Sequence, residues 1–227
     1  MTDPGLLERG TGTRCGMDKC EQLVRRLLEV AGTTYAAEAG IKINDRPMPL
    51  FQLLVLCMLA SKPIDATTAM RAAKELFRAG LRTPKAVLAS DRRTMISAFG
   101  RAHYVRYDES SATRLTDMAE RLRDEYSGDL REIAERSQHD IVAAKRMLKK
   151  FKGIGDTGAD IFLREVQDIW PWVQPYFDDR ATTAARQLGL PTQPAKLGAL
   201  APRNNALLAA ALVRASLDDD VRQRVTG

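Results

Sequence analysis

The chain has little of several residue types on which whole classes of protein depend. Its 227 residues include three cysteines, Cys15, Cys20 and Cys57, and two histidines, His103 and His139. An odd number of cysteines argues against a disulfide framework, and Cys57 lies in an apolar, helix-like run that is typical of a buried thiol. Because histidine ligands are scarce and no cysteine follows Cys57, the sequence disfavours a metal or metal-cluster site.

Long apolar runs are also missing. Hydrophobic residues make up 44% of the chain, but no run reaches the length of about 18 residues that a membrane-spanning helix requires. The first residues, MTDPGLLERGTGTR, lack the charged-then-apolar order of a secretory signal. We therefore expect no contact with a membrane, and a cytoplasmic location.

Strand-like alternation is nearly absent, and apolar residues instead recur at spacings of three and four, which predicts an all-α protein. The predicted helices cover residues 18–40, 49–61, 65–80, 83–90, 91–100, 111–128, 129–137, 140–151, 157–170, 180–190 and 204–218. Residues that favour helix ends punctuate them: Asp65, Thr83, Ser90 and Asn204 at starts, and Gly80, Gly100 and Gly128 at stops. The short connections predict a compact array of helices.

The charge balance is basic. Lysine and arginine number 35 against 29 aspartates and glutamates, which gives a formal net charge of +6. Such a balance favours a polyanionic partner, but many basic proteins bind nothing of the kind, so charge alone leaves the partner open.

A glycine-rich hairpin, KKFKGIGDTGADIF, joins two of the predicted helices at residues 149–162. Gly153 and Gly155 permit a positive φ and a close backbone approach, while Ile154 between them can anchor the turn in the core. The helix that follows begins with unpaired N–H groups and the positive end of its dipole, which suits a phosphate. Charge around this start comes from Lys149, Lys150 and Lys152.

The same hairpin has a purely structural interpretation. It can be a tight helix–helix turn that ends in a glycine cap, with its lysines solvated in a last helical turn that the dipole favours. Contacts from backbone amides to phosphates carry no base information, so the binding interpretation predicts little dependence on nucleic-acid sequence.

The hairpin resembles the helix-hairpin-helix of the endonuclease III-like DNA glycosylase superfamily, which it matches at Gly153, Ile154, Gly155 and Ala159. Downstream, YFDDRATTAARQLGLP is similar to the superfamily stretch that carries the catalytic aspartate, and the alignment places Asp178 at that position. The resemblance covers roughly residues 49–191. It implies a two-lobed helical fold, with a central helical barrel that includes the hairpin at 49–165 and a second lobe formed by 1–48 and 166–227.

Departures from the superfamily pattern refine what the resemblance implies. Bifunctional members carry a nucleophilic lysine where this chain has Thr157, and a hydroxyl cannot form the Schiff base of a lyase reaction. The cysteines that bind an iron–sulfur cluster are missing near the C-terminus, so we expect no cluster and no cofactor, although the hairpin backbone could bind a cation. The frequent glutamine of the first loop is Lys62 here.

The resemblance assigns roles to further residues. Asp178 would stabilise the positive charge that develops on the sugar, although Asp179 could take this role, and either could simply cap a helix. A flipped base would lie near Tyr104, Tyr107 and Tyr176, unless these rings pack the core. We expect the DNA contacts to come from Lys62, Lys149, Lys150, Lys152, Gly153, Ile154, Gly155 and Thr157. For Lys62 the alternatives are a gap or phosphate contact, a solvated loop residue, or an amine nucleophile that attacks C1′.

The sequence therefore predicts a monomeric, nucleoid-associated DNA glycosylase that removes a damaged or mismatched base from double-stranded DNA by hydrolysis. An alternative is a non-catalytic helix-hairpin-helix protein that binds DNA, which Thr157 and the altered DDR motif favour. A third interpretation is a helical protein–protein module, which would have negligible affinity for DNA.

Overall fold

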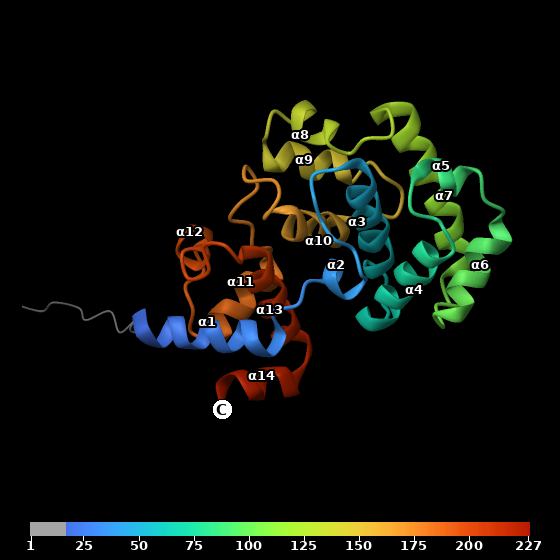
Figure 1. Ribbon diagram of the computed structural model, residues 1–227. Coiled ribbons are helices and arrows are strands. Elements are labelled where there is room, and N and C mark those ends of the chain that lie inside the picture. Colours follow the sequence, from blue (N-terminus) through green and yellow to red (C-terminus); the bar gives the residue numbers. More distant parts are fainter. Residues whose placement is uncertain (1–16) are drawn as a thin grey trace, which may run out of the picture.

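The computed structural model describes residues 17–227, and every regular element in this range is a helix, which confirms the all-α prediction (Figure 1). Cys15 lies outside the described residues. The helices are α1 (Met17–Ala31), α2 (Tyr35–Glu38), α3 (Pro47–Ala60), α4 (Ala66–Arg78), α5 (Pro84–Leu88), α6 (Arg92–Arg101), α7 (Asp108–Tyr126), α8 (Glu132–Arg136), α9 (Ile141–Leu148), α10 (Asp156–Val166), α11 (Asp179–Gln187), α12 (Pro194–Gly198), α13 (Asn205–Leu217) and α14 (Asp219–Thr226). None of them is long and apolar enough to cross a membrane.

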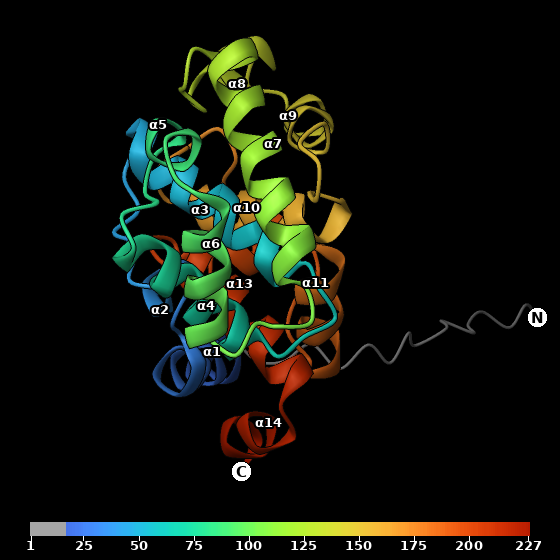
Figure 2. The same ribbon diagram turned by 90° about the vertical axis from the view of Figure 1, so that its right-hand side faces the viewer.

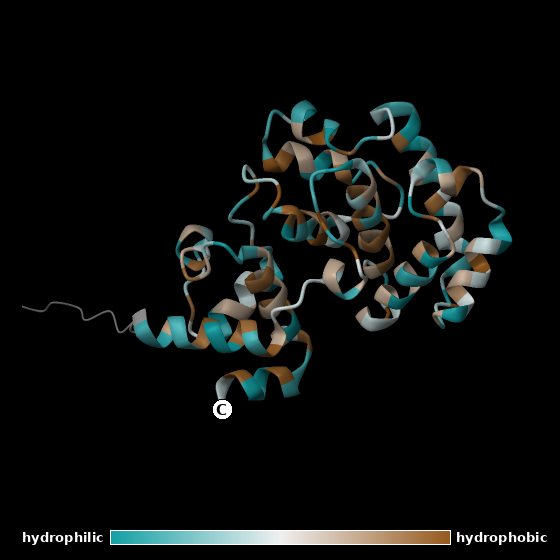
Figure 3. Cartoon of the chain, viewed as in Figure 1, coloured by the Kyte–Doolittle hydropathy of each residue, from teal (hydrophilic) through white to brown (hydrophobic). Residues whose placement is uncertain are grey.

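The buried apolar residues form two clusters. The larger cluster draws on α2 to α10, and the smaller one on α1, α11, α13 and α14, together with the α12 segment. Figures 1 and 2 show the same two groups of helices from perpendicular directions. At the centre of the larger group, α3 is apolar on nearly all sides, as expected for a helix with neighbours all round (Figure 3).

The larger cluster includes residues from outside the sequence range expected for the central barrel. Tyr35, Ile41 and Trp170 pack in the larger cluster, although they lie outside the 49–165 segment expected for the central barrel. The division of the chain into 49–165 and its two flanks therefore remains a proposal. Helix α10 connects the groups, because it packs against α3 and α9 in one and against α13 in the other.

Helix starts follow side-chain chemistry. Asp65 caps α4 as expected, because its carboxylate accepts a hydrogen bond from the backbone of the first turn. The expected start at Ser90 is displaced by one residue, since Asp91 supplies the capping carboxylate of α6. Gly100 does not end this helix. It lies inside α6, and the left-handed backbone that terminates the turn occurs at His103, with φ of 59°.

The single helix predicted for residues 18–40 is wrong. Helix α1 stops at Ala31, and a new short helix starts at Tyr35 after Thr34, whose Oγ1 accepts a hydrogen bond from Ala37 N at 3.1 Å. The first amides of α2 also find a distant acceptor, because Glu165 accepts from Tyr35 N and Ala36 N at 3.0 Å each. A tertiary contact therefore fixes a break that helical periodicity could not reveal.

Candidate active site and nucleic-acid interface

A cleft of about 880 Å³ lies between the two groups of helices. One wall comes from the turn after α3, where Lys62 lies, and from α10, where Thr157, Asp160 and Arg164 lie. The rest of the lining comes from the start of α11, the connection between α1 and α2, and the facing ends of α13 and α14. Segments distant in sequence thus meet around one concave surface, as substrate sites commonly require.

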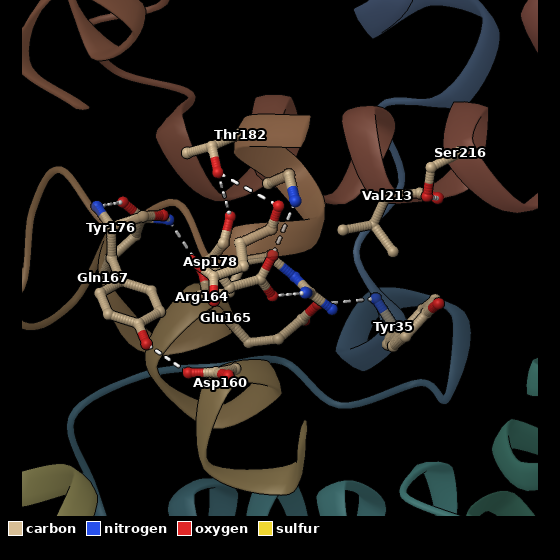
Figure 4. A network of polar contacts seen from close by, with 12 residues as sticks. Tyr35, Asp160, Arg164, Glu165, Gln167, Tyr176, Asp178, Thr182, Val213 and Ser216 are labelled. Atoms are coloured by element: carbon tan, nitrogen blue, oxygen red, sulfur yellow. Dashed lines mark hydrogen bonds and ion pairs between the residues drawn. The ribbon is translucent and has the colours of Figure 1, made fainter. Parts of the chain in front are cut away.

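Asp178 is the N-cap of α11 and reaches the cleft with both carboxylate oxygens occupied. Its Oδ1 accepts a hydrogen bond from Ala181 N at 2.8 Å, and its Oδ2 pairs with Arg164 Nη1 at 2.5 Å. The side chains of Asp178 and Arg164 are only 8% and 3% exposed. Figure 4 shows this pair at the centre of the polar network. The capping and the catalytic interpretations of Asp178 are therefore compatible, because the cap fixes the carboxylate at the cleft.

Arg164 lines the cleft beside Asp178 with an almost fully buried side chain. Its guanidinium carbon lies 5.6 Å from the centre of the Tyr35 ring, and its buried Nε has no hydrogen-bond partner among residues 17–227. Beside it, burial raises the pKa of Glu165 above its ordinary value, although the nearby Arg164 charge and the amides of Tyr35 and Ala36 act in the opposite direction. The cleft thus rests on a dense, largely dehydrated set of ionisable groups.

Tyr176, one of the tyrosines expected in the base pocket, is not among the residues that line the cleft. Its hydroxyl donates to Asp160 Oδ1 at 2.5 Å (Figure 4). Asp160 also pairs with Lys145 Nζ at 2.5 Å. Burial, together with this hydrogen bond to a carboxylate, strongly raises the pKa of Tyr176. Its backbone N–H and carbonyl are both satisfied by the Gln167 amide. Tyr176 therefore holds the chain that leads to Asp178.

The hairpin has the backbone geometry that its glycines predict. Gly153 adopts a φ of +94°, and a Cβ there would lie 3.0 Å from side-chain atoms of Arg114 and Met58. Ile154 is buried in the larger cluster. Gly155 is the N-cap of α10, and no side chain of the described residues caps this helix, although Asp156 and Thr157 lie in its first turn. The first backbone N–H groups of α10 are therefore available to a hydrogen-bond acceptor from outside the helix.

The hairpin lysines are partly neutralised within the chain. Lys149 Nζ donates to Asp156 Oδ1 at 2.7 Å, and this hydrogen bond lowers the pKa of Asp156. Lys152 Nζ lies 3.1 Å from Asp117 Oδ2. Lys150 has no ion pair with any described residue, although its carbonyl accepts from Arg121. These exposed pairs are weak and screened by salt, so a polyanion can compete for the lysines.

The other two tyrosines expected in the base pocket are Tyr104 and Tyr107. The Lys62 ammonium is 5.7 Å from the centre of the Tyr107 ring, and Tyr107 itself is half-buried at the start of α7. Tyr104 is fully buried, with its hydroxyl 3.2 Å from Ser111 Oγ. Tyr104 therefore packs the core and does not line the cleft, which corrects the expectation of a base-pocket role for this residue.

The structure brings together Lys62, Thr157, Asp178 and Asp179 around the cleft, whereas Lys149, Lys150, Lys152 and the hairpin glycines do not line it. Sequence reasoning missed Arg164. Its position offered a signal, because Thr157, Ile161 and Arg164 follow at helical spacing and so share one face of α10 with the cleft. An arginine in the run IFLREV is also unusual among buried neighbours.

The sequence of the chain matches no family model and no curated protein. Two solved structures are similar to it, both of endonuclease III with DNA. The non-covalent complex has a TM-score of 0.51 at 15% identity, and the trapped covalent intermediate, an estranged-adenine complex, has a TM-score of 0.48 at 16% identity. Each alignment covers 88% of this chain and 85% of the other. The described chain therefore has the endonuclease III fold, as the resemblance in its sequence implied.

Proposed function

We propose that the protein is a monofunctional DNA glycosylase with Asp178 as its catalytic carboxylate. The observation that supports this most directly is the placement of Asp178, which lies at the cleft with a fixed orientation in a fold that endonuclease III uses to bind DNA. Thr157 lines the same cleft from the first turn of α10. The finer parts of the proposal, namely the reaction and the lack of lyase activity, rest on these residues.

The reaction would break the bond between C1′ of the deoxyribose and the base nitrogen, and the bonding electron pair would leave with the base. The Asp178 carboxylate would stabilise the positive charge on the sugar while water adds to C1′. One proton of that water would pass to Asp178 or to solvent, and the released base would take up a proton. Thr157 offers no amine for a covalent imine with C1′, so the product would be an intact strand with an abasic site.

DNA would be bound outside the cleft by the hairpin and at the cleft by Lys62. The uncapped start of α10 offers amides to one phosphate, and Lys150 adds an ammonium group that has no ion pair with any described residue. Lys62 lines the same cleft as Asp178, where it would contact a phosphate or fill the space left by a flipped base.

The test is a panel of duplexes that carry uracil, an oxidised pyrimidine, oxoguanine, an alkylated purine or a mismatch. Strand breaks that form only after alkali indicate release of a base without lyase activity. We expect Thr157→Lys to produce some breaks without alkali, because it restores an amine at the hairpin. Breaks without alkali in the unmodified protein would contradict the assignment of Thr157 and direct attention to Lys62.

A second function, DNA binding without catalysis, is favoured by one observation. Arg164 pairs with Asp178 at 2.5 Å in a buried setting, and its charge opposes the field that a catalytic carboxylate would exert on the sugar. This alternative predicts tight, salt-dependent binding of every duplex with no release of any base. The glycosylase proposal instead requires release from at least one of them.

A further inference from the structure

A second hollow, with a volume of about 430 Å³, lies away from the cleft and shares none of its lining residues. It is bounded by the loop after α2, the first turns of α3 and the last turns of α4. The cleft lies at the other end of α3, and at about 1.5 Å per residue the ends of this helix are roughly 20 Å apart. Whatever this hollow binds is therefore separate from the proposed reaction.

The hollow is strongly basic, because none of the described residues that line it is an aspartate or glutamate. Its basic side chains are Lys42, Lys74, Arg78 and Arg82. Arg78 pairs with Glu75 at 2.6 Å, and Arg82 donates through Nε to a backbone carbonyl at 2.8 Å. Lys42 and Lys74 have no ion-pair partner among the described residues. An anion in the hollow would thus meet uncompensated positive charge on two sides.

Gln52 provides a second and independent observation. It belongs to α3, is only 9% exposed, lines the hollow, and its side-chain amide has no hydrogen-bond partner among the described residues. Its neighbours along the helix are buried apolar residues. The amide atoms of Gln52 are not among the fully buried polar atoms that lack a partner, so they are accessible, and the hollow that Gln52 lines is the side from which they can be reached. A ligand with hydrogen-bonding oxygens could therefore bind this amide directly.

The start of α3 adds to the positive potential. The N-cap residue, Arg46, makes no side-chain capping bond, and Pro47 and Pro49 have no N–H, so Met48 carries the first free amide. A 14-residue helix therefore directs the positive end of its dipole at this side of the hollow. Met48 and Phe77 supply apolar wall beside these charges.

We propose that this hollow is a binding site for a small organic phosphate of about the size of a nucleoside monophosphate. The phosphoryl oxygens are held by Lys42, Lys74 and the Gln52 amide, while the carbon body lies against Met48 and Phe77. The phosphoryl group, and not the body, supplies most of the affinity, because the charged contacts outnumber the apolar ones.

The test measures binding of three probes to the full chain by calorimetry: adenosine monophosphate, adenosine and inorganic phosphate. The variants are Lys74→Met and Gln52→Met, both of which keep side-chain length and retain an apolar stem. The matched control is Lys196→Met, which instead removes one exposed positive charge from α12 in the other group of helices. A second readout is the side-chain amide resonance of Gln52, assigned by its loss in Gln52→Met and followed during titration.

We expect the monophosphate and phosphate to bind and adenosine not to bind, with a loss of about tenfold or more in each hollow variant, as for other charge-assisted contacts. The Lys196→Met control should bind within about twofold of the unmodified protein, since its charge lies outside the hollow. Equal binding by all variants, or no shift of the Gln52 resonance, would overturn the proposal. If Lys74→Met instead weakened binding of a short DNA duplex and no probe bound, the hollow would be a DNA contact and the small-molecule assignment would be wrong.

Discussion

Asp178 and Arg164 form the residue-scale unit on which the account depends. The resemblance in the sequence, counted back from the LGL stretch, placed Asp178 at the position of the catalytic aspartate and left Asp179 as the alternative. It did not predict Arg164 as a partner, since the contact joins α10 to the start of α11 and its existence depends on how those helices pack. Spacing along one chain can place a residue on a helix face, but it does not reveal which charge meets it across an interface.

Replacement of Arg164 by methionine should destabilise the protein by about 3–5 kcal/mol, because Asp178 would be left as a buried charge without its partner. Urea unfolding measures this change. The matched control is Arg123→Met, which removes an exposed ion pair with Asp124 and should leave the unfolding midpoint unchanged. An equal loss of stability in both variants would show that the buried ion pair contributes no more than an exposed one. The double variant with Asp178→Asn should recover part of the loss.

Glu165 should make stability depend on pH. Burial raises its pKa in the folded protein above that of the unfolded chain, so the folded state binds its proton more tightly. Its contribution to stability is therefore greatest below the unfolded pKa and declines as pH rises toward the folded pKa. In Glu165→Gln this group no longer titrates, so the free energy of unfolding of the unmodified protein, relative to the variant, should fall from about pH 4 to pH 7. Urea unfolding at intervals across this range measures the difference, and a flat or rising difference would contradict the assigned direction.

At the scale of elements, the hairpin between α9 and α10 was the most predictable feature, since two glycines and an isoleucine define it locally. The least predictable was the break between α1 and α2, where a carboxylate from residue 165 binds the amides of residues 35 and 36. Helix caps also differ in how far the local sequence predicts them. Asp65 caps its own helix and could be predicted, whereas α10 has no side-chain cap despite Asp156 and Thr157 in its first turn.

The hairpin glycines should respond differently to alanine. Gly153→Ala places a Cβ 3.0 Å from Met58 Cγ at a φ of +94°, and should cost about 1–3 kcal/mol of stability. Gly155→Ala has no atom within contact range of the new methyl group and a negative φ of −96°, so stability should hardly change. Thermal unfolding of both variants checks this expectation. A larger loss for Gly155→Ala would show that the hairpin is not anchored through Gly153.

At the scale of the whole molecule, the helical periodicity gave the class and the resemblance gave the architecture, and the structural similarity confirmed the fold. What the sequence could not provide was the composition of the cleft. Its walls come from five separate stretches of chain, and Tyr104, one of the three tyrosines expected in the pocket, is a core residue. The free amide of Gln52 and the basic hollow beside it likewise arise only when α2, α3 and α4 are packed together.

The central claim is that Asp178 performs chemistry in a cleft that also binds DNA. The most direct measurement compares single-turnover base release and duplex affinity for the unmodified protein, Asp178→Asn and Asp179→Asn, with any duplex of the panel that yields alkali-dependent breaks. Asparagine keeps an oxygen to accept from Ala181 N, so the helix cap should survive. We predict that Asp178→Asn binds the duplex as well as the unmodified protein but releases base about 100-fold or more slowly, while Asp179→Asn stays within about threefold. Undiminished release by Asp178→Asn, or no release from any duplex by the unmodified protein, would contradict the account.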